Sequence, residues 1–444
     1  MLLQNWWYTT LLGLKYTVCP PLREEITSDV LIVGAGIAGL SAALRLMDSG
    51  KKIVLLERNI CGGSTTGKSA GFLTPESELE LAQLVRRFGP KGAKDLWEVA
   101  TKGANIIVSN IKKYNIKCDL QEQPSLYLGL GRSGRSAVQE EAAVRRSLGF
   151  QCELYNKKQT KSVIGSKDYS SAIRYDGTFG MNPLQFAQGV KQVLLEHGIQ
   201  IFESSEVVLL KGNKAKTHLG SVTADEIIFC VDKIKPALSK YSKNIYHAQT
   251  FMSISEPLEK QDIDTIFPQG SFQCWDSDLI YTYFRLTGDK RLLVGGGDMI
   301  TTFSKKDATT PRVIERVISK LKKKIPSLKH VQFIQYWPGR IDITRDLLPT
   351  ILKKPKYNTI HFVFGCVGLP WAAFCGNLVA GHVLDEKDLA KKYYKYFSVN
   401  RKFVMPLSSQ QILGKKLMFT LSNAWAKYLQ VDRGKNIKLK DKNW

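Results

Sequence analysis

The chain has 444 residues and lacks an apolar run long enough to cross a membrane. No stretch reaches the roughly 18 uncharged apolar residues that a spanning helix needs. The apolar, aromatic start at residues 1–14 has no basic residue before Lys15, so it also lacks the charged region of a signal peptide. We therefore expect a soluble, cytoplasmic protein whose first segment packs on the body.

Cysteine is present but not in patterns that bind metal. None of the eight cysteines forms a C-x-x-C pair, and no Cys/His cluster has metal-ligand spacing. Several lie in apolar runs, as Cys230 does after Ile227-Ile228-Phe229. We expect buried, reduced thiols and no metal site, as in a cytosolic protein.

Acidic residues are outnumbered by basic ones, 40 against 64, which gives a net charge of +24. Either a basic face meets nucleic acid, anionic lipid or an acidic substrate, or lysines simply cover the solvated faces. Most lysines are scattered, which favours the second explanation. The tail at 386–444 is the exception, with 14 Lys or Arg and 4 Asp or Glu. Its segment 412–429 could form an amphipathic helix that touches a membrane, or a helix packed on the body.

The sequence predicts one βαβ unit near the start of the chain. Residues 29–34 form a short apolar run of a buried parallel strand, and 37–49 have helical spacing of apolar and small residues. Gly50 ends this helix, and 52–57 is the next strand. A strand, a tight turn, a helix and a strand within about 30 residues form one βαβ unit.

The turn of this unit fits the dinucleotide pattern G-x-G-x-x-G. Gly34 makes the tight turn, Gly36 lets the backbone approach a pyrophosphate, and Gly39 lets helix and strand pack closely. Glu57 ends the second strand, where a carboxylate can accept both ribose hydroxyls. The phosphates lie at the helix N-terminus. The predicted contacts on these elements are Gly34, Gly36, Ile37, Ala38, Gly39, Glu57 and Arg58.

The sequence favours FAD over NAD. There is one complete fingerprint, whereas a nicotinamide-using flavoprotein reductase normally needs two. The loop Gly62–Gly71 follows the Glu57 strand directly, and its hydroxyls and backbone N–H groups suit the far phosphate and the flavin edge. From this loop we expect contacts by Thr65, Thr66, Lys68, Ser69 and Ala70.

Together with three later segments, these residues resemble the D-amino-acid-oxidase-like FAD-dependent oxidoreductases, a family that includes glycine and sarcosine oxidases. The γ-glutamylputrescine oxidoreductases are nearest in pattern. The later segments are 180–207, 337–349 and 364–376. The resemblance implies that the backbone at Val207 meets the adenine, and that the flavin loop contains Gly365, Gly368, Leu369 and Pro370.

The third segment departs from the family pattern. Leu369-Pro370-Trp371 stands where many members carry small residues or a histidine, and a Trp371 beside the flavin would narrow the pocket. Trp371 could equally fill core. Lys68 stands where relatives often have arginine. No His or Cys falls clearly at a covalent attachment point, so we expect FAD to be bound non-covalently.

The resemblance implies hydride transfer from an amine or amino-acid C–H to flavin N5, with O2 or a quinone as electron acceptor. Tyr283 and Arg285 share one face of a strand, where Arg285 could clamp a substrate carboxylate or lie on a sheet edge. Arg340 could contact substrate or pair with Asp342 or Asp346. The candidate catalytic residues are Tyr283, Arg285, Arg340 and Trp371.

The expected fold class is α/β: a Rossmann-like FAD-binding domain with an inserted α+β substrate domain built on a mainly antiparallel sheet. We expect the FAD-binding domain at 27–80, 175–240 and 335–385, and the substrate domain at 81–174 and 241–334. An N-terminal packing segment (1–26) and a basic helical tail (386–444) complete the chain. Two alternatives stay open. One is a flavoenzyme of this fold acting on a tRNA base, although the methyltransferase-like domain of two-domain tRNA enzymes is absent and nucleic acid is the less favoured partner. The other is a flavoprotein docked on a membrane or partner by its tail.

Overall fold

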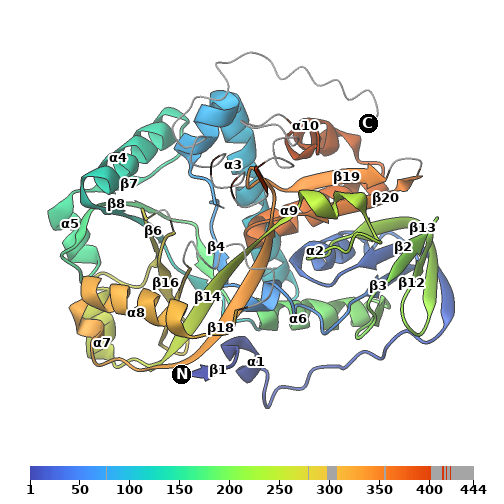
Figure 1. Cartoon of the computed structure of the whole chain (residues 1–444), viewed down its shortest axis with the longest axis horizontal. Coiled ribbons are helices and arrows are strands. Elements are labelled where there is room, and N and C mark those ends of the chain that lie inside the picture. Colours follow the sequence, from blue (N-terminus) through green and yellow to red (C-terminus); the bar gives the residue numbers. More distant parts are fainter. Residues whose placement is uncertain are drawn as a thin grey trace.

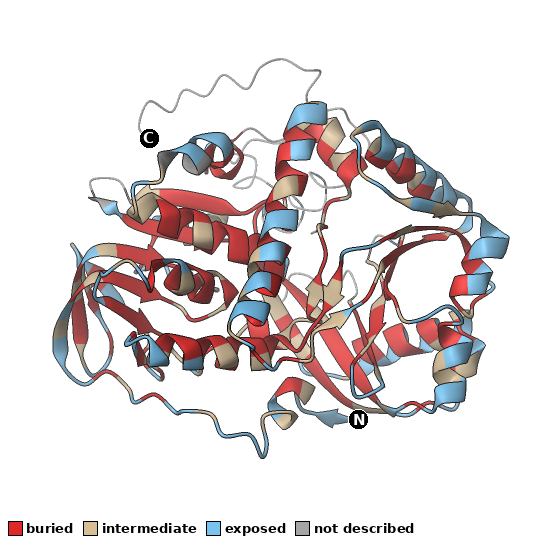
Figure 2. Cartoon of the chain, turned by 180° about the vertical axis from the view of Figure 1, so that it is seen from behind, coloured by how far each residue is buried: buried red, intermediate tan, exposed pale blue. Residues whose placement is uncertain are grey.

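The computed structural model describes residues 1–401 except 77, 279, 298–307 and 355–356, and in the tail only 413, 414, 417 and 421. Two large sheets lie in separate halves of the molecule (Figure 1). The expected fold class is confirmed. Figure 2 shows that both sheets are largely buried and that exposed residues concentrate on the outer helices and loops.

The first half is built on an eight-stranded sheet whose centre is parallel. Its order is β10-β3-β2-β13-β12-β11, with β20 pairing β13 and β19 pairing β20. Val30, Leu31 and Ile32 are fully buried, as expected for a parallel strand covered on both faces. The strands are β2 (Glu25–Val33), β3 (Ile53–Leu56), β10 (Gln200–Phe202), β11 (Leu209–Lys211), β12 (Lys214–Lys216), β13 (Ser221–Phe229), β19 (Thr350–Lys354) and β20 (Tyr357–Phe364).

This half includes the helices α2 (Ile37–Leu46), α3 (Leu81–Lys113), α6 (Pro183–Glu196) and α9 (Leu369–Val383). They share one hydrophobic core with the inner face of the sheet. Helices α2 and α9 cross so closely that a Cβ on Gly376 would lie 1.9 Å from the Ala38 carbonyl oxygen. This crossing places the starts of the two helices side by side, although more than 300 residues separate them.

The second half is a nine-stranded sheet of order β1-β18-β14-β17-β16-β15-β6-β8-β7. It is mainly antiparallel, as expected, with parallel pairing between β1 and β18 and between β6 and β15. The long strands β14 and β18 run toward the first half (Figure 1). The strands are β1 (Leu2–Leu3), β6 (Ser125–Leu130), β7 (Glu153–Tyr155), β8 (Tyr169–Tyr175), β14 (Tyr246–Pro257), β15 (Gln273–Asp276), β16 (Tyr283–Leu286), β17 (Arg291–Gly296) and β18 (Phe333–Ile343).

Helices α4 (Gly131–Ser147), α5 (Lys157–Val163), α7 (Lys260–Ile266) and α8 (Arg312–Lys324) cover this sheet. Helix α8 is basic and amphipathic. It buries one stripe, made of Val313, Ile314, Val317, Ile318 and Leu321, and leaves most of its basic residues exposed. Three short strands form a further small sheet: β4 (Phe72–Leu73), β5 (Gln121–Glu122) and β9 (Phe179–Gly180).

Two expected domain ranges need correction. Helix α3 falls in the range 81–174 expected for the substrate domain, yet it packs on α9 in the core of the first half. A Cβ on Gly103 of α3 would lie 1.8 Å from the Pro370 carbonyl oxygen. Conversely, 335–343 was expected in the FAD-binding domain but lies in β18 of the second sheet. An amphipathic pattern indicates that one face of an element is buried but not which element covers that face. For this reason the sequence assigned α3 and 335–343 to the wrong half.

The N-terminal segment packs on the body through helix α1 (Trp6–Thr9). Trp7 is 1% exposed, and the Asn5 side chain caps α1 by accepting from the Trp7 amide. At the other end of the chain, helix α10 (Lys387–Phe397) packs on α9 and α3. The tail helix expected at 412–429 lies outside the described residues, apart from positions 413, 414, 417 and 421. In the described part of the chain no helix is long and apolar enough to span a bilayer.

The eight cysteines all fall within the described ranges and form no disulfide. No group of His, Cys, Asp and Glu in those ranges is arranged to hold a metal ion. Most of the thiols are buried, and burial raises the pKa of Cys61 well above its ordinary value.

Acid sensitivity is expected from the ion pair that ties residue 401 to the β18–β19 connection. Burial alone would raise the pKa of Asp346, but the Arg401 guanidinium, bonded to it at 2.5 and 2.6 Å, lowers it to about 2. The unfolded chain takes up this proton near pH 3.8, so the stabilisation is complete above about pH 4 and is lost as the pH falls toward 2. The difference in unfolding free energy between wild type and Asp346→Asn should therefore shrink by about 2 kcal/mol between pH 5 and 2. Urea titrations at pH 5, 4, 3 and 2 measure it, and a constant difference would contradict the assignment.

Candidate functional site

The turn between β2 and α2 shows why each fingerprint glycine is there. Gly34 has φ +100°, and a Cβ on it would lie 2.4 Å from the Cys230 carbonyl oxygen. A Cβ on Gly39 would lie 1.9 Å from the Gly34 carbonyl oxygen. These two glycines are thus required by packing within the protein. Gly36 is different, because its Cβ would meet only Thr66 Oγ1, at 3.2 Å.

Gly36 therefore opens on free space rather than on protein, as a residue beside a bound pyrophosphate must. It also caps α2 in an extended conformation, and the Ile37 amide donates to Thr66 Oγ1 at 3.0 Å. The helix N-terminus, with Ile37 and Ala38 in its first turn, is the positively polarised end that favours phosphate. Thr66 is placed at this terminus, as the sequence predicted.

A hollow opens at the carboxyl ends of β2, β3, β10 and β13. Its volume is about 640 Å³ when the open solvent at its mouth is counted. Of the predicted contacts it brings together Gly34, Gly36, Glu57, Arg58, Thr65, Thr66 and Val207. Ligands of open α/β sheets bind in this position, outside the carboxyl ends of the strands.

Glu57 is one of the carboxylates that line this hollow. It is 6% exposed, and its two oxygens accept from the Ala35 and Asn59 amides, each at 2.9 Å. Burial raises the pKa of Glu57, while the two amides act in the opposite direction. Each carboxylate oxygen keeps a lone pair, so Glu57 is held in place and can still accept from a pair of ribose hydroxyls.

Val207 lines the opposite wall and is 4% exposed. Its peptide N–H and C=O make no hydrogen bond within the described part of the chain. Buried backbone groups nearly always have partners, so an unpaired peptide on the wall of a hollow indicates a ligand with donors and acceptors of its own. A nucleobase edge has this character. With the Glu57 carboxylate and the α2 terminus, the residues present fit the adenosine diphosphate half of FAD.

The segment after β13 also lines the hollow, and the sequence did not predict this. Asp232 and Lys233 line the hollow, and burial together with the nearby Asp342 raises the pKa of Asp232. Asp342 accepts from the Lys233 amide at 2.5 Å and from His247 Nδ1 at 2.8 Å. A signal was available, because the apolar run Ile227-Ile228-Phe229 is typical of a buried strand and parallel strands end at one edge of the sheet.

The predicted loop Gly62–Gly71 lies between the two halves. A short 3-10 helix at Thr66–Lys68 forms its centre. The Thr65 hydroxyl donates to the Arg340 carbonyl at 3.3 Å, and Trp337 Nε1 donates to the Lys68 carbonyl at 3.1 Å. The loop thus connects the nucleotide hollow with β18 of the second sheet.

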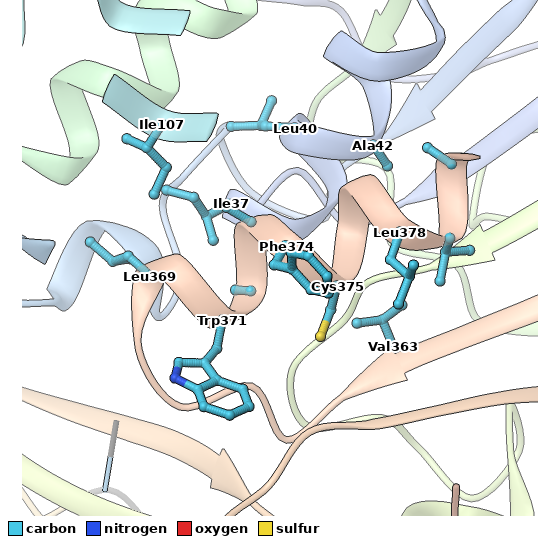
Figure 3. Close-up of a cluster of buried hydrophobic side chains, with 14 of the residues drawn as sticks. Ile37, Leu40, Ala42, Ile107, Val363, Leu369, Trp371, Phe374, Cys375 and Leu378 are labelled. Carbon is cyan, nitrogen blue, oxygen red and sulfur yellow. The ribbon is translucent and has the colours of Figure 1, made fainter. Parts of the chain in front are cut away.

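The segment at 365–370, which the resemblance predicts to be the flavin loop, leads into helix α9, and α9 packs on α2. Gly365 and Gly368 both have positive φ, +67° and +93°, and α9 begins directly after them at Leu369 with Pro370 in its first turn. Figure 3 shows Ile37 of α2 close to Leu369 and Phe374 of α9. Ile37 and Leu369 belong to one hydrophobic core, whereas Gly365, Gly368, Leu369 and Pro370 do not line the hollow itself.

Trp371 does not face open space. The Trp371 residue is 1% exposed, and its indole packs edge-on against Phe397 of α10, with ring centroids 6.3 Å apart. In this structure the Trp371 side chain therefore lies among core residues.

Arg285 has a different role from the predicted carboxylate clamp. It is fully buried, and its guanidinium donates to the carbonyls of Ala70 at 2.8 Å, Met181 at 2.7 Å and Leu286 at 3.2 Å. It is not at a sheet edge either, since β16 lies inside the nine-stranded sheet. Burial lowers the pKa of Arg285 to about 10. Arg285 is a structural residue that holds the 67–71 loop.

Tyr283 and Arg340 lie near the interface between the two halves. Tyr283 fits against Gly295, where a Cβ would lie 2.2 Å from its ring, and its hydroxyl donates to Met252 Sδ at 3.2 Å. Of the two carboxylates named as candidate partners of Arg340, Asp342 bonds His247 and Asp346 bonds Arg401. Arg340 stays a candidate for substrate or cofactor contact.

A buried ion group joins α3 to α4. Arg145, 2% exposed, pairs with Glu76 and with Glu141, whose carboxylate is 3.0 Å from Nε. Glu141 also accepts from the Leu81 and Ala82 amides at the start of α3. Nothing in the sequence marked this group, because charges at helical spacing usually lie on a solvated face.

Comparison with known proteins agrees with this geometry. The family described as FAD dependent oxidoreductase (DAO) matches residues 29–381. A probable oxidoreductase OrdL of Haemophilus influenzae is 27% identical over 382 residues, which cover 83% of this chain and 86% of that protein. The gamma-glutamylputrescine oxidoreductase of Escherichia coli is 28% identical over 345 residues, covering 76% and 78%.

Solved structures show the same fold. Glycine oxidase from Geobacillus kaustophilus superposes with a TM-score of 0.71 at 14% identity, covering 85% of this chain and 99% of that one. L-proline dehydrogenase from P. horikoshii gives a TM-score of 0.70 at 15% identity, covering 85% and 97%. With the fingerprint turn, the Glu57 carboxylate and the returning α9 loop in place, the chain belongs to the DAO family of FAD-dependent oxidoreductases.

Proposed function

We propose that this chain oxidises an amine or an amino-acid-like substrate at a C–H bond next to nitrogen. The observation that carries the proposal is the contact of the 65–71 loop with β18 at the interface of the halves, through the Thr65–Arg340 and Trp337–Lys68 hydrogen bonds. The names of relatives support the substrate class, since one is a gamma-glutamylputrescine oxidoreductase and another, from Bacillus subtilis, is a glycine oxidase.

The protein's share of this reaction is binding and orientation. Bound flavin supplies the electron-pair acceptor that takes the hydride from the substrate C–H. Glu57 and the α2 terminus hold the nucleotide half, while Lys68, Ser69 and Ala70 contact the flavin edge. The cofactor is non-covalent in this proposal, because the buried Cys61 thiol has a strongly raised pKa and is thus a poor nucleophile. The electron acceptor is O2 or a quinone, and the site of action is the cytoplasm.

Arg340 and Tyr283 are the proposed substrate-side residues. Arg340 is the candidate cation for a substrate carboxylate, because Arg285 is held by backbone carbonyls. Tyr283 lies edge-on to Phe72, with centroids 6.0 Å apart, and provides an aromatic surface between the halves. Trp371 is not proposed as a substrate contact, since core residues cover it.

The test is anaerobic mixing of the FAD-loaded protein with primary amines, N-methyl amino acids and α-amino acids. We expect at least one of these classes to bleach the flavin absorption. If that substrate carries a carboxylate, Arg340→Met should raise KM at least tenfold, about 1.4 kcal/mol. Arg312→Met on the exposed face of α8 is the matched control and should leave KM unchanged. Bleaching by dithionite but by no compound of the panel would refute the proposal.

A further inference from the structure

The 67–71 loop is held in an unusual way: five consecutive backbone carbonyls each accept a hydrogen bond from outside the loop. Consecutive carbonyls of an irregular loop seldom all find protein donors, because they point in different directions. The five bonds run from Asn5 Nδ2 to Gly67 O (2.6 Å), Trp337 Nε1 to Lys68 O (3.1 Å), Trp7 Nε1 to Ser69 O (2.8 Å), Arg285 Nε to Ala70 O (2.8 Å) and the Met181 amide to Gly71 O (2.9 Å).

The donors form a rigid block. Trp7, Trp337, Arg285 and Met181 are all buried, although they come from distant parts of the sequence. The Trp7 and Trp337 rings meet edge to face with centroids 6.2 Å apart, and Arg285 Cζ lies 5.9 Å from the Trp7 ring. Two of the five donors, Asn5 and Trp7, belong to the N-terminal segment. This segment is therefore part of the support of the loop.

The bond to Ser69 has a direct consequence for its neighbour. The C=O of Ser69 and the N–H of Ala70 belong to one planar trans peptide, so they point in opposite directions. Trp7 holds this carbonyl, and the Ala70 N–H must therefore point away from Trp7. In the described part of the chain the Ala70 N–H has no hydrogen-bond partner, whereas the Lys68, Ser69 and Gly71 amides donate to Thr65, Thr66 and Ser69.

We propose that Trp7 is a positioning residue, which orients the Ser69–Ala70 peptide so that the Ala70 N–H donates to an acceptor on the flavin ring. This inference rests on the proposed flavin contacts of the loop. A donor fixed beside the ring stabilises the electron-rich reduced form more than the oxidised form, because the bond strengthens as negative charge develops. Trp7 thereby acts on the redox potential through a single peptide, without touching the cofactor.

The experiment compares Trp7→Phe with Trp6→Phe in the full-length, FAD-loaded protein. Trp7→Phe removes the indole N–H and keeps an aromatic ring in the core. Trp6 is the matched control, since its half-buried ring lies against Arg291, 4.3 Å away, and donates nothing to the loop. The flavin midpoint potential and visible spectrum are measured by dithionite titration with reference dyes, so no substrate is needed.

Trp7→Phe should retain FAD but stabilise reduced over oxidised flavin at least tenfold less, a fall in potential of about 30 mV for two electrons. Trp6→Phe should match wild type. An unchanged potential and spectrum in Trp7→Phe would overturn the inference. Because the readout does not involve an amine, a failed substrate panel would refute the proposed function and leave this result standing.

A second variant covers the case in which Trp7→Phe does not fold. Ala70→Pro removes the amide donor itself, and Ser69 already has the extended conformation (φ −73°, ψ 158°) that a residue before proline prefers. Ala70→Pro should lower the potential to the same extent while Trp7 stays in place. If Ala70→Pro binds FAD with the wild-type potential, the Ala70 N–H is not the donor and the proposal fails.

Discussion

A Gly36→Val variant is expected to fold and to lose affinity for FAD at least 100-fold, about 2.7 kcal/mol. The fold should survive because Gly36 has an ordinary extended conformation (φ −76°, ψ −176°), which a β-branched residue adopts readily. The added Cβ would meet only the Thr66 hydroxyl at 3.2 Å, and a hydroxyl can move by a few tenths of an ångström. The branched side chain would instead fill the space at the α2 terminus that the phosphates need.

Two measurements on this variant separate binding from folding. Circular dichroism and thermal unfolding should resemble those of wild type without cofactor, while FAD titration followed by fluorescence should show the loss of affinity. Gly39→Ala is the contrasting control: its Cβ would lie 1.9 Å from the Gly34 carbonyl, so α2 cannot pack and both fold and FAD binding should be lost. Stoichiometric FAD in Gly36→Val would mean that the pyrophosphate does not lie at this turn.

The second large effect is expected at Arg145. Arg145→Met should lower the free energy of unfolding by about 3–5 kcal/mol, because it leaves Glu76 and Glu141 buried without their cation. The side chain also lies over the rings of Tyr175 and Trp97, 4.1 and 4.5 Å from their centroids, and methionine keeps most of that packing but not the charge. The start of α3 should loosen, since Glu141 caps it.

Arg146→Met is the matched control for this prediction. Arg146 is the next residue of α4 and is exposed, so its loss should change stability by less than about 0.5 kcal/mol. Urea unfolding of the two variants and of wild type gives the comparison. Equal unfolding free energies for Arg145→Met and Arg146→Met would show that the buried ion group contributes no net stability.

The nucleotide half of the site could be predicted because its chemistry is local. Gly34, Gly36, Gly39 and Glu57 lie within one βαβ unit, where the spacing alone fixes which backbone turns and which carboxylate meet the ligand. The four residues lie at the turn and at the strand end where the pattern predicts them. Gly34 and Gly39 are required by packing within the protein, whereas Gly36 faces open space.

The interface of the halves could not be predicted in the same way. Alternation along β16 states that Tyr283 and Arg285 share a face, but not that three backbone carbonyls cover that face at Arg285. Likewise, the sequence pattern does not show where the Trp371 side chain points. Only the packing of α10 shows that its indole is in the core. Such roles depend on contacts between different segments of the chain, which periodicity does not encode.

The N-terminal segment is the clearest case of information hidden in tertiary contacts. Its apolar and aromatic residues predict packing on the body, and Trp7 is indeed buried. Nothing in the sequence connects Asn5 or Trp7 with the loop more than 60 residues further on. The hydrogen bonds to Gly67 and Ser69 make that connection and give the segment a place in the cofactor site.

The central claim is that FAD binds in the hollow at the carboxyl ends of β2, β3 and β13. It is tested most directly by adding FAD to the full-length protein, removing free flavin by gel filtration and recording the visible absorption spectrum. We predict the absorption bands of a protein-bound flavin at one FAD per chain, and their loss in Gly36→Val. A folded wild-type protein that takes up no flavin, or one whose Gly36→Val variant keeps it, would contradict the account.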